Sequence, residues 1–151
     1  MNRKEFKVSF VLSYIIVFIM VILSIGGLFI SNLYKDNNHL LAVWHANDLV
    51  TLLIAVPIFI FSMVLFKKNG SIKALLIWFT MLWYSVYNYA YYLFGASFNA
   101  FFLLYVVIFS LSLIALIIGL SKFPIRNIQN DLQSKLPIKF ITTYMLAVAT
   151  V

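Results

Sequence analysis

The 151-residue chain is 64% hydrophobic and only 10% charged, with a mean hydropathy of +1.03. Soluble domains average about 25% charged residues, so this chain has too little polar surface to cover a water-facing globule and is expected in lipid. The net charge of +7 does not indicate nucleic-acid binding, because the basic residues flank apolar runs and form no separate basic patch.

Four apolar runs are long enough to cross a membrane as helices, which takes about 20 residues each. The first, residues 8–30, follows the charged start MNRKEFK and is longer than the core of a signal peptide (about 7–15 residues), so we predict a retained span. The other three full spans are predicted at about 49–66, 72–94 and 98–120. A fifth apolar run, 140–151, is too short to span, and we interpret it as a span cut short. The prediction is therefore an all-α polytopic bundle forming one integral membrane domain over residues 1–151.

The distribution of basic residues predicts a cytoplasmic N-terminus, since Lys and Arg accumulate on the inner side of membrane proteins. Of the 11 Lys and Arg residues, only Lys35 falls on the opposite side from the rest. The others are Arg3, Lys4, Lys7, Lys67, Lys68, Lys73, Lys122, Arg126, Lys135 and Lys139. Segments 31–48 and 95–99 should therefore face outside.

Local signals refine this arrangement. The turn KKNGS makes the second and third spans antiparallel neighbours, and GASFN does the same for the third and fourth. Pro57 lies within the second span and should kink it. The cytoplasmic segment FPIRNIQNDLQSKLPIK is either a short helix on the inner leaflet or a solvated loop.

Tyrosines are concentrated on the outer half of the third span, where YSVYNYAYYLFGASFN contains five of the nine in the chain. Four side chains at i, i+3, i+4 and i+7 predict one inward-facing stripe. The stripe consists of Tyr84, Tyr87, Asn88 and Tyr91. Tyr89 and Tyr92 point elsewhere and, with Trp83, fit the aromatic belt at the lipid interface.

Asp48 is the acid closest to a span on the outer side, and a carboxylate at that depth is costly unless it is paired, which makes it a functional candidate. His45 lies one turn before it, and Thr51 shares its face if the helix begins early. Small residues of the first span, Gly26 and Gly27 among them, would allow close helix approach. The candidate ligand-binding set is His45, Asp48, Tyr84, Tyr87, Asn88, Tyr91, Asn99 and Tyr105.

Two interpretations of this set remain open. It could form a pocket for a small ligand or ion, or its tyrosines and asparagines could only hold the helices together, as polar side chains commonly do in membranes. No GxSxG, HExxH or P-loop motif is present, so no catalytic residue is assigned, although Asp48 and His45 could act as acid and base. The spacing of His39, His45 and Asp48 matches no metal or haem motif, and the absence of cysteine excludes thiolate chemistry. No metal or cofactor is predicted.

The stretches WHANDLVTLL and YNYAYYLFGASFNAFFLLYV, within about residues 44–110, resemble a group of uncharacterised bacterial multi-spanning membrane proteins. This resemblance implies a plasma-membrane location and no particular activity. We therefore predict a non-enzymatic membrane protein with a polar pocket in its outer half, such as a transporter, a sensor or a complex subunit. The alternatives are a membrane enzyme and a purely structural subunit. Lipid is the expected surrounding partner, with a second copy or another membrane subunit as further candidates.

Overall fold

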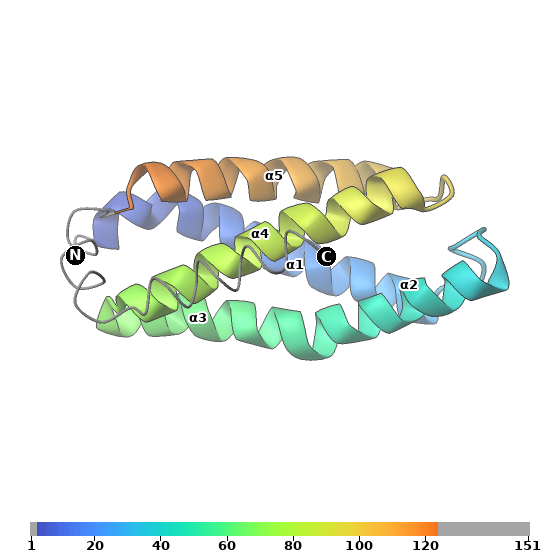
Figure 1. The fold of residues 1–151 in the computed structure, drawn as a ribbon, viewed down its shortest axis with the longest axis horizontal. Coiled ribbons are helices and arrows are strands. Elements are labelled where there is room, and N and C mark those ends of the chain that lie inside the picture. Colours follow the sequence, from blue (N-terminus) through green and yellow to red (C-terminus); the bar gives the residue numbers. More distant parts are fainter. Residues whose placement is uncertain (1–2, 124–151) are drawn as a thin grey trace, which may run out of the picture.

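The computed structural model describes residues 3–123, which are helical and contain no strand, in agreement with the predicted all-α class (Figure 1). In chain order the elements are η1 (Arg3–Phe6), α1 (Lys7–Phe29), α2 (Asn38–Val50), η2 (Thr51–Ala55), α3 (Val56–Asn69), α4 (Ile72–Gly95) and α5 (Phe102–Ser121). The α1–α2 and α4–α5 connections lie at one end of the bundle, and the α3–α4 turn lies at the other (Figure 1). The predicted fifth run, the amphipathic segment and Arg126, Lys135 and Lys139 lie outside the described residues.

Three described helices are long and apolar enough to cross a membrane: Lys7–Phe29, the continuous helix Asn38–Asn69, and Phe102–Ser121. The helix α4 has 24 residues and matches the bounds of the predicted third span. It is not one of the three, because it carries five tyrosines together with Lys73, Ser85 and Asn88. The protein is therefore a helical chain with three candidate spans, and a fourth span at α4 stays a prediction.

The helix that contains the second predicted span, 49–66, begins earlier than that span, at Asn38. The side chain of Asn37 accepts a hydrogen bond from the backbone N–H of Leu40 at 3.0 Å and so caps the helix before its apolar part begins. The connection between α1 and α2 therefore consists of residues 30–37. The helix Asn38–Asn69 contains 32 residues. At about 1.5 Å per residue it is roughly 48 Å long, well beyond the hydrocarbon thickness of about 30 Å.

This long helix changes its hydrogen-bond pattern just before Pro57. The segment Thr51–Ala55 is π-helical, and the N–H of Val56 bonds to the carbonyl of Thr51, five residues earlier. Proline lacks an N–H, and its ring collides with the carbonyl four residues earlier in a regular helix. The wider π-turn avoids this collision by inserting one extra residue into the helix. The irregularity next to Pro57 is therefore a π-turn.

The helix α4 packs against both α3 and α5, while α1 packs against α2 and α5. At the end of the bundle near the chain start, Phe6, Phe10, Phe66 and Trp78 form a buried aromatic cluster. The indole Nε1 of Trp78 donates to Ser13 Oγ at 2.9 Å, which satisfies its buried donor. The opposite end is packed by polar contacts.

Candidate functional site

The buried carboxylate of Asp48, only 3% exposed, is the centre of the polar end of the bundle. Its Oδ2 accepts a hydrogen bond from the Tyr34 hydroxyl at 2.6 Å, and its Oδ1 accepts one from the Tyr92 hydroxyl at 2.8 Å. Tyr34 comes from the connection before α2, and Tyr92 comes from α4. One carboxylate therefore joins three parts of the chain that sequence spacing alone does not bring together.

A row of side-chain hydrogen bonds continues along the contact between the long helix and α4. Asn47 Nδ2 donates to Asn88 Oδ1 at 2.8 Å and to the Tyr92 hydroxyl at 3.1 Å. One turn further, Thr51 Oγ1 and the Tyr84 hydroxyl lie 2.8 Å apart. Asp48, Thr51, Tyr84 and Asn88, which were singled out from the sequence, thus take part in contacts between the long helix and α4. Asn47 was missed, because an asparagine beside an acid looks like part of a polar loop.

The helix α1 contributes to this cluster through the lack of a side chain at Gly27. A Cβ built there would overlap Asp48 Oδ2 and would lie 2.6 Å from the Tyr34 hydroxyl oxygen. The neighbouring Gly26 faces the ring of Phe101 in the same way. This pair of glycines lets α2 and α5 approach the α1 backbone closely, which is the role predicted for them.

A second carboxylate, Asp36, joins the α1–α2 connection to the α4–α5 connection. It accepts hydrogen bonds from the backbone N–H of Ser97 at 3.1 Å, from the Ser97 hydroxyl at 2.7 Å and from Trp44 Nε1 at 3.1 Å. Asp36 lies two residues after Tyr34. These hydrogen bonds of Asp36, called the Asp36 clamp below, therefore also hold Tyr34 in position next to Asp48. No local sequence pattern predicts this contact, because Ser97 is 61 residues away from Asp36.

Four tyrosine rings pack around the carboxylate. The ring centroids of Tyr92 and Tyr105 are 5.0 Å apart, and Tyr92 also stacks on Tyr34 at 6.2 Å and on Tyr89 at 5.9 Å. Burial, reinforced by neighbouring Tyr92 and Asp48, raises the pKa of Tyr34 well above its ordinary value. Tyr34 therefore keeps its proton and remains a hydrogen-bond donor to Asp48.

The predicted inward face of α4 was wrong for Tyr87 and Tyr91. Tyr87 is 69% exposed and Tyr91 is 44% exposed, whereas Tyr89 and Tyr92, expected at the lipid interface, are each 2% exposed. The buried residues of α4 recur at alternating steps of three and four. They include Leu75, Trp78, Leu82, Ser85, Tyr89 and Tyr92. This regular seam against the neighbouring helices includes Tyr89 and Tyr92 and turns Tyr87 away from the bundle.

The remaining predicted site residues fall into different places. His45 is exposed on α2, and its ring centroid is 5.8 Å from that of Tyr34. Asn99 is buried in the α4–α5 connection, and its Oδ1 accepts from the backbone N–H of Phe101 at 2.9 Å, a local structural role. Tyr105 is 1% exposed, and its hydroxyl has no hydrogen-bond partner within residues 3–123.

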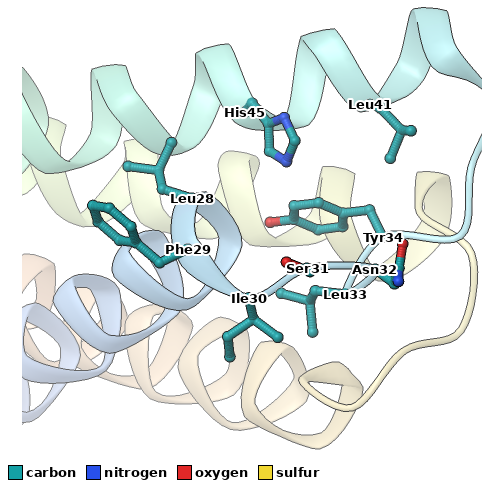
Figure 2. Close-up of a pocket in the computed structure, with 9 residues that line it drawn as sticks. All are labelled: Leu28, Phe29, Ile30, Ser31, Asn32, Leu33, Tyr34, Leu41 and His45. Atoms are coloured by element: carbon teal, nitrogen blue, oxygen red, sulfur yellow. The ribbon is translucent and has the colours of Figure 1, made fainter.

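A pocket of about 360 Å³ opens beside Tyr34 at the same end of the bundle. Its lining is Leu28, Phe29, Ile30, Ser31, Asn32, Leu33, Tyr34, Leu41 and His45. In Figure 2, His45 and Leu41 extend from α2 toward Tyr34, with the connecting residues Ser31 and Leu33 on the other side. Tyr34 therefore lines this pocket and also donates to the Asp48 carboxylate.

Comparisons with known proteins identify no relative of this chain: no family model, no curated protein and no solved structure matches it. Within residues 3–123, no three His, Cys, Asp or Glu side chains gather as a metal-binding group would require. The chemistry of the site is therefore argued from its own geometry: one buried carboxylate surrounded by hydroxyl and amide groups.

We expect Tyr92→Phe to lower the free energy of unfolding by roughly 1–3 kcal/mol, because it removes a hydroxyl donor from a buried carboxylate. The matched variant Tyr87→Phe removes a hydroxyl from the exposed side of the same helix and should change stability by less than about 0.5 kcal/mol. Thermal unfolding of the purified proteins in one detergent checks both values. Equal losses in the two variants would contradict the assignment of faces on α4.

We expect Gly27→Ala to destabilise the bundle by roughly 1–3 kcal/mol, since the added methyl group forces Asp48 and Tyr34 away from α1. Gly95→Ala is the control, because a Cβ there comes no closer than 3.4 Å to Trp44, an ordinary contact. The two melting temperatures, measured side by side, provide the comparison. If Gly27→Ala melted at the same temperature as the parent protein, the Asp48 cluster would not depend on contact with α1.

Proposed function

We propose that this protein is a multi-pass integral membrane protein with four spans and a cytoplasmic N-terminus, and that its outer half binds a small polar ligand or ion. In this proposal α4 also crosses the membrane, as the third of the four spans in chain order. The argument for it is packing: α4 lies between α3 and α5, and its buried polar residues Ser85, Asn88 and Tyr92 face the bundle. A helix whose polar groups are satisfied inside the protein does not need to be uniformly apolar to reside in lipid.

The charge distribution along the helices supports the orientation. Lys7, Lys67, Lys68, Lys73 and Lys122 all belong to helix ends at the end of the bundle where the chain starts (Figure 1). Lys35 lies in the connection at the opposite end. By the positive-inside rule the first end is cytoplasmic, and the Asp48 cluster lies in the outer half. The surrounding membrane would be the plasma membrane of a bacterium, as the resemblance described above implies.

The observation that carries the binding proposal is that the buried carboxylate of Asp48 has only neutral hydrogen-bond partners. Both hydrogen bonds to its carboxylate come from neutral tyrosine hydroxyls. A carboxylate has about four acceptor positions, so acceptor capacity remains on both oxygens. A buried charge that is solvated only by neutral donors is costly to keep. A structure that needed only adhesion between helices could use an uncharged side chain at this position.

The adjacent pocket supports the same proposal. It begins at Tyr34 and is bordered by His45 and the polar side chains Ser31 and Asn32, at the end of the bundle assigned to the outside. The Asp36 clamp holds the connection that carries Tyr34. The approach to Asp48 is thus built on fixed parts of the chain, as binding sites generally are.

Structural adhesion is the second candidate, and the geometry gives it one specific argument: both oxygens of Asp48 already bond to other elements. An enzyme that uses Asp48 with His45 has less support, since the Tyr34 hydroxyl occupies Asp48 Oδ2 while His45 is exposed and faces the Tyr34 ring.

The orientation predicts opposite accessibility for single cysteines, which can be introduced cleanly because the chain has no cysteine. Asn38→Cys should react with a membrane-impermeant maleimide added to intact cells, because residue 38 begins α2 at the outer end. Asn69→Cys, at the α3–α4 turn, should react only after the cells are opened. Labelling with the reverse pattern would overturn the orientation.

The binding role of Asp48 makes a prediction that does not need the ligand. In ligand-free buffer, Asp48→Asn should unfold at the same temperature as the parent protein or above it, because the substitution removes a buried charge and keeps the shape. Asp36→Asn should unfold at a lower temperature, since it weakens a carboxylate that receives several donors. If Asp48→Asn lost roughly as much stability as Asp36→Asn, the adhesion role would replace the binding role.

A further inference from the structure

Two hydroxyl groups near Asp48 are buried without a partner. The Oη of Tyr105 and the Oγ of Ser24 make no hydrogen bond within the described part of the chain. Tyr105 is 1% exposed and Ser24 is 0% exposed, so bulk water does not reach them. Buried polar groups without partners are rare in folded proteins, and each one needs an explanation, such as an ion or a water molecule that belongs there.

Both residues belong to helix faces that pack near the carboxylate. The Tyr105 ring stacks on Tyr92, which bonds to Asp48. The Tyr105 hydroxyl lies within electrostatic range of Asp48 and near the polar groups of Tyr34 and Asn99, but it forms no hydrogen bond of good geometry with either. Ser24 lies three residues before Gly27 on α1, and residues three apart share a helix face. Gly27 is the point where α1 meets Asp48 Oδ2. Ser24 thus shares the face of α1 that meets Asp48, and Tyr105 lies on α5 against Tyr92, which bonds to Asp48.

The charge and the atom types limit what can bind there. The Asp48 carboxylate carries a single negative charge, and its hydrogen-bond partners are neutral hydroxyls. A monovalent cation would therefore neutralise the cluster. A divalent cation would leave a buried positive charge. Calcium prefers six to eight oxygen ligands, several of them from carboxylates, at about 2.3–2.6 Å. Carboxylate and hydroxyl oxygens suit a hard alkali cation. The contact at Gly27 leaves little room, which favours a small ion.

We propose that the Asp48 cluster is a binding site for a small monovalent metal cation of the sodium type, with Asp48, Tyr105 and Ser24 as its side-chain ligands. This inference rests on the proposed ligand-binding function and specifies it. Asn88 is not included, because its unpartnered atom is the amide Nδ2, a donor that cannot coordinate a cation. Tyr34 and Tyr92 position the carboxylate and do not need to leave it, since each carboxylate oxygen has a further lone pair.

The test is thermal unfolding of the purified full chain in detergent, titrated with sodium, potassium or choline chloride at constant ionic strength. Sodium should raise the melting temperature in a saturable way, by a few degrees when it is well above its dissociation constant, and choline should not. The shift should vanish in Asp48→Asn. In Ser24→Ala and Tyr105→Phe it should require sodium concentrations about tenfold higher or more. Tyr87→Phe should respond like the parent protein.

Direct binding of ²²Na⁺ to the purified protein provides the second measurement, with about one ion per chain expected and displacement by unlabelled sodium but not by choline. Equal melting shifts in all three salts, or a sodium shift that persists in Asp48→Asn, would overturn the cation site. If Asp48→Asn does not fold, the same decision is made with Ser24→Ala and Tyr105→Phe. A failed sodium test with Asp48→Asn still as stable as the parent would leave the binding function standing for another ligand.

Discussion

The structure of the bundle end that contains Asp48 depends on one constraint: the carboxylate of Asp48 is buried and must be solvated by the protein itself. Tyrosine hydroxyls from the α1–α2 connection and from α4 satisfy it. Several other features follow from this need. Gly27 leaves space for the carboxylate against α1, and Asp36 fixes the connection that supplies Tyr34. The aromatic rings exclude water from a region that would otherwise hydrate.

Most of the helices were predictable from the sequence, because apolar runs of a given length have few alternatives in a chain this hydrophobic. Two helix boundaries at the Asp48 end of the bundle, the starts of α2 and α5, were harder to predict. The start of α2 is set by the Asn37 cap and lies in a polar stretch that hydropathy cannot distinguish from a loop. The helix α5 likewise begins only at Phe102, because the residues before it form a connection that is held by the hydrogen bond from the Phe101 N–H to Asn99.

The candidate site was predicted in part. Asp48 stood out because acids are rare near spans, and Tyr84 and Asn88 followed from their spacing. The tyrosines of α4 could not be sorted by spacing, since they are so frequent that two different stripes both fit a helical period. Packing against α3 and α5 decides between them, and it selects Tyr89 and Tyr92. Tyr34 and Asp36 could not be predicted, because their partners are distant in sequence and no local pattern links them.

The π-turn at Thr51–Ala55 has a consequence for how the long helix divides its tasks. An inserted residue shifts the angular phase of everything before it relative to everything after it, by roughly 100° in a helix of 3.6 residues per turn. The face that α2 presents around Asp48 is therefore set independently of the face that α3 presents to the aromatic cluster. The two parts of this helix, α2 and α3, therefore present faces that are set separately. Substitutions at the polar end of the bundle can be accommodated while the aromatic end keeps its packing.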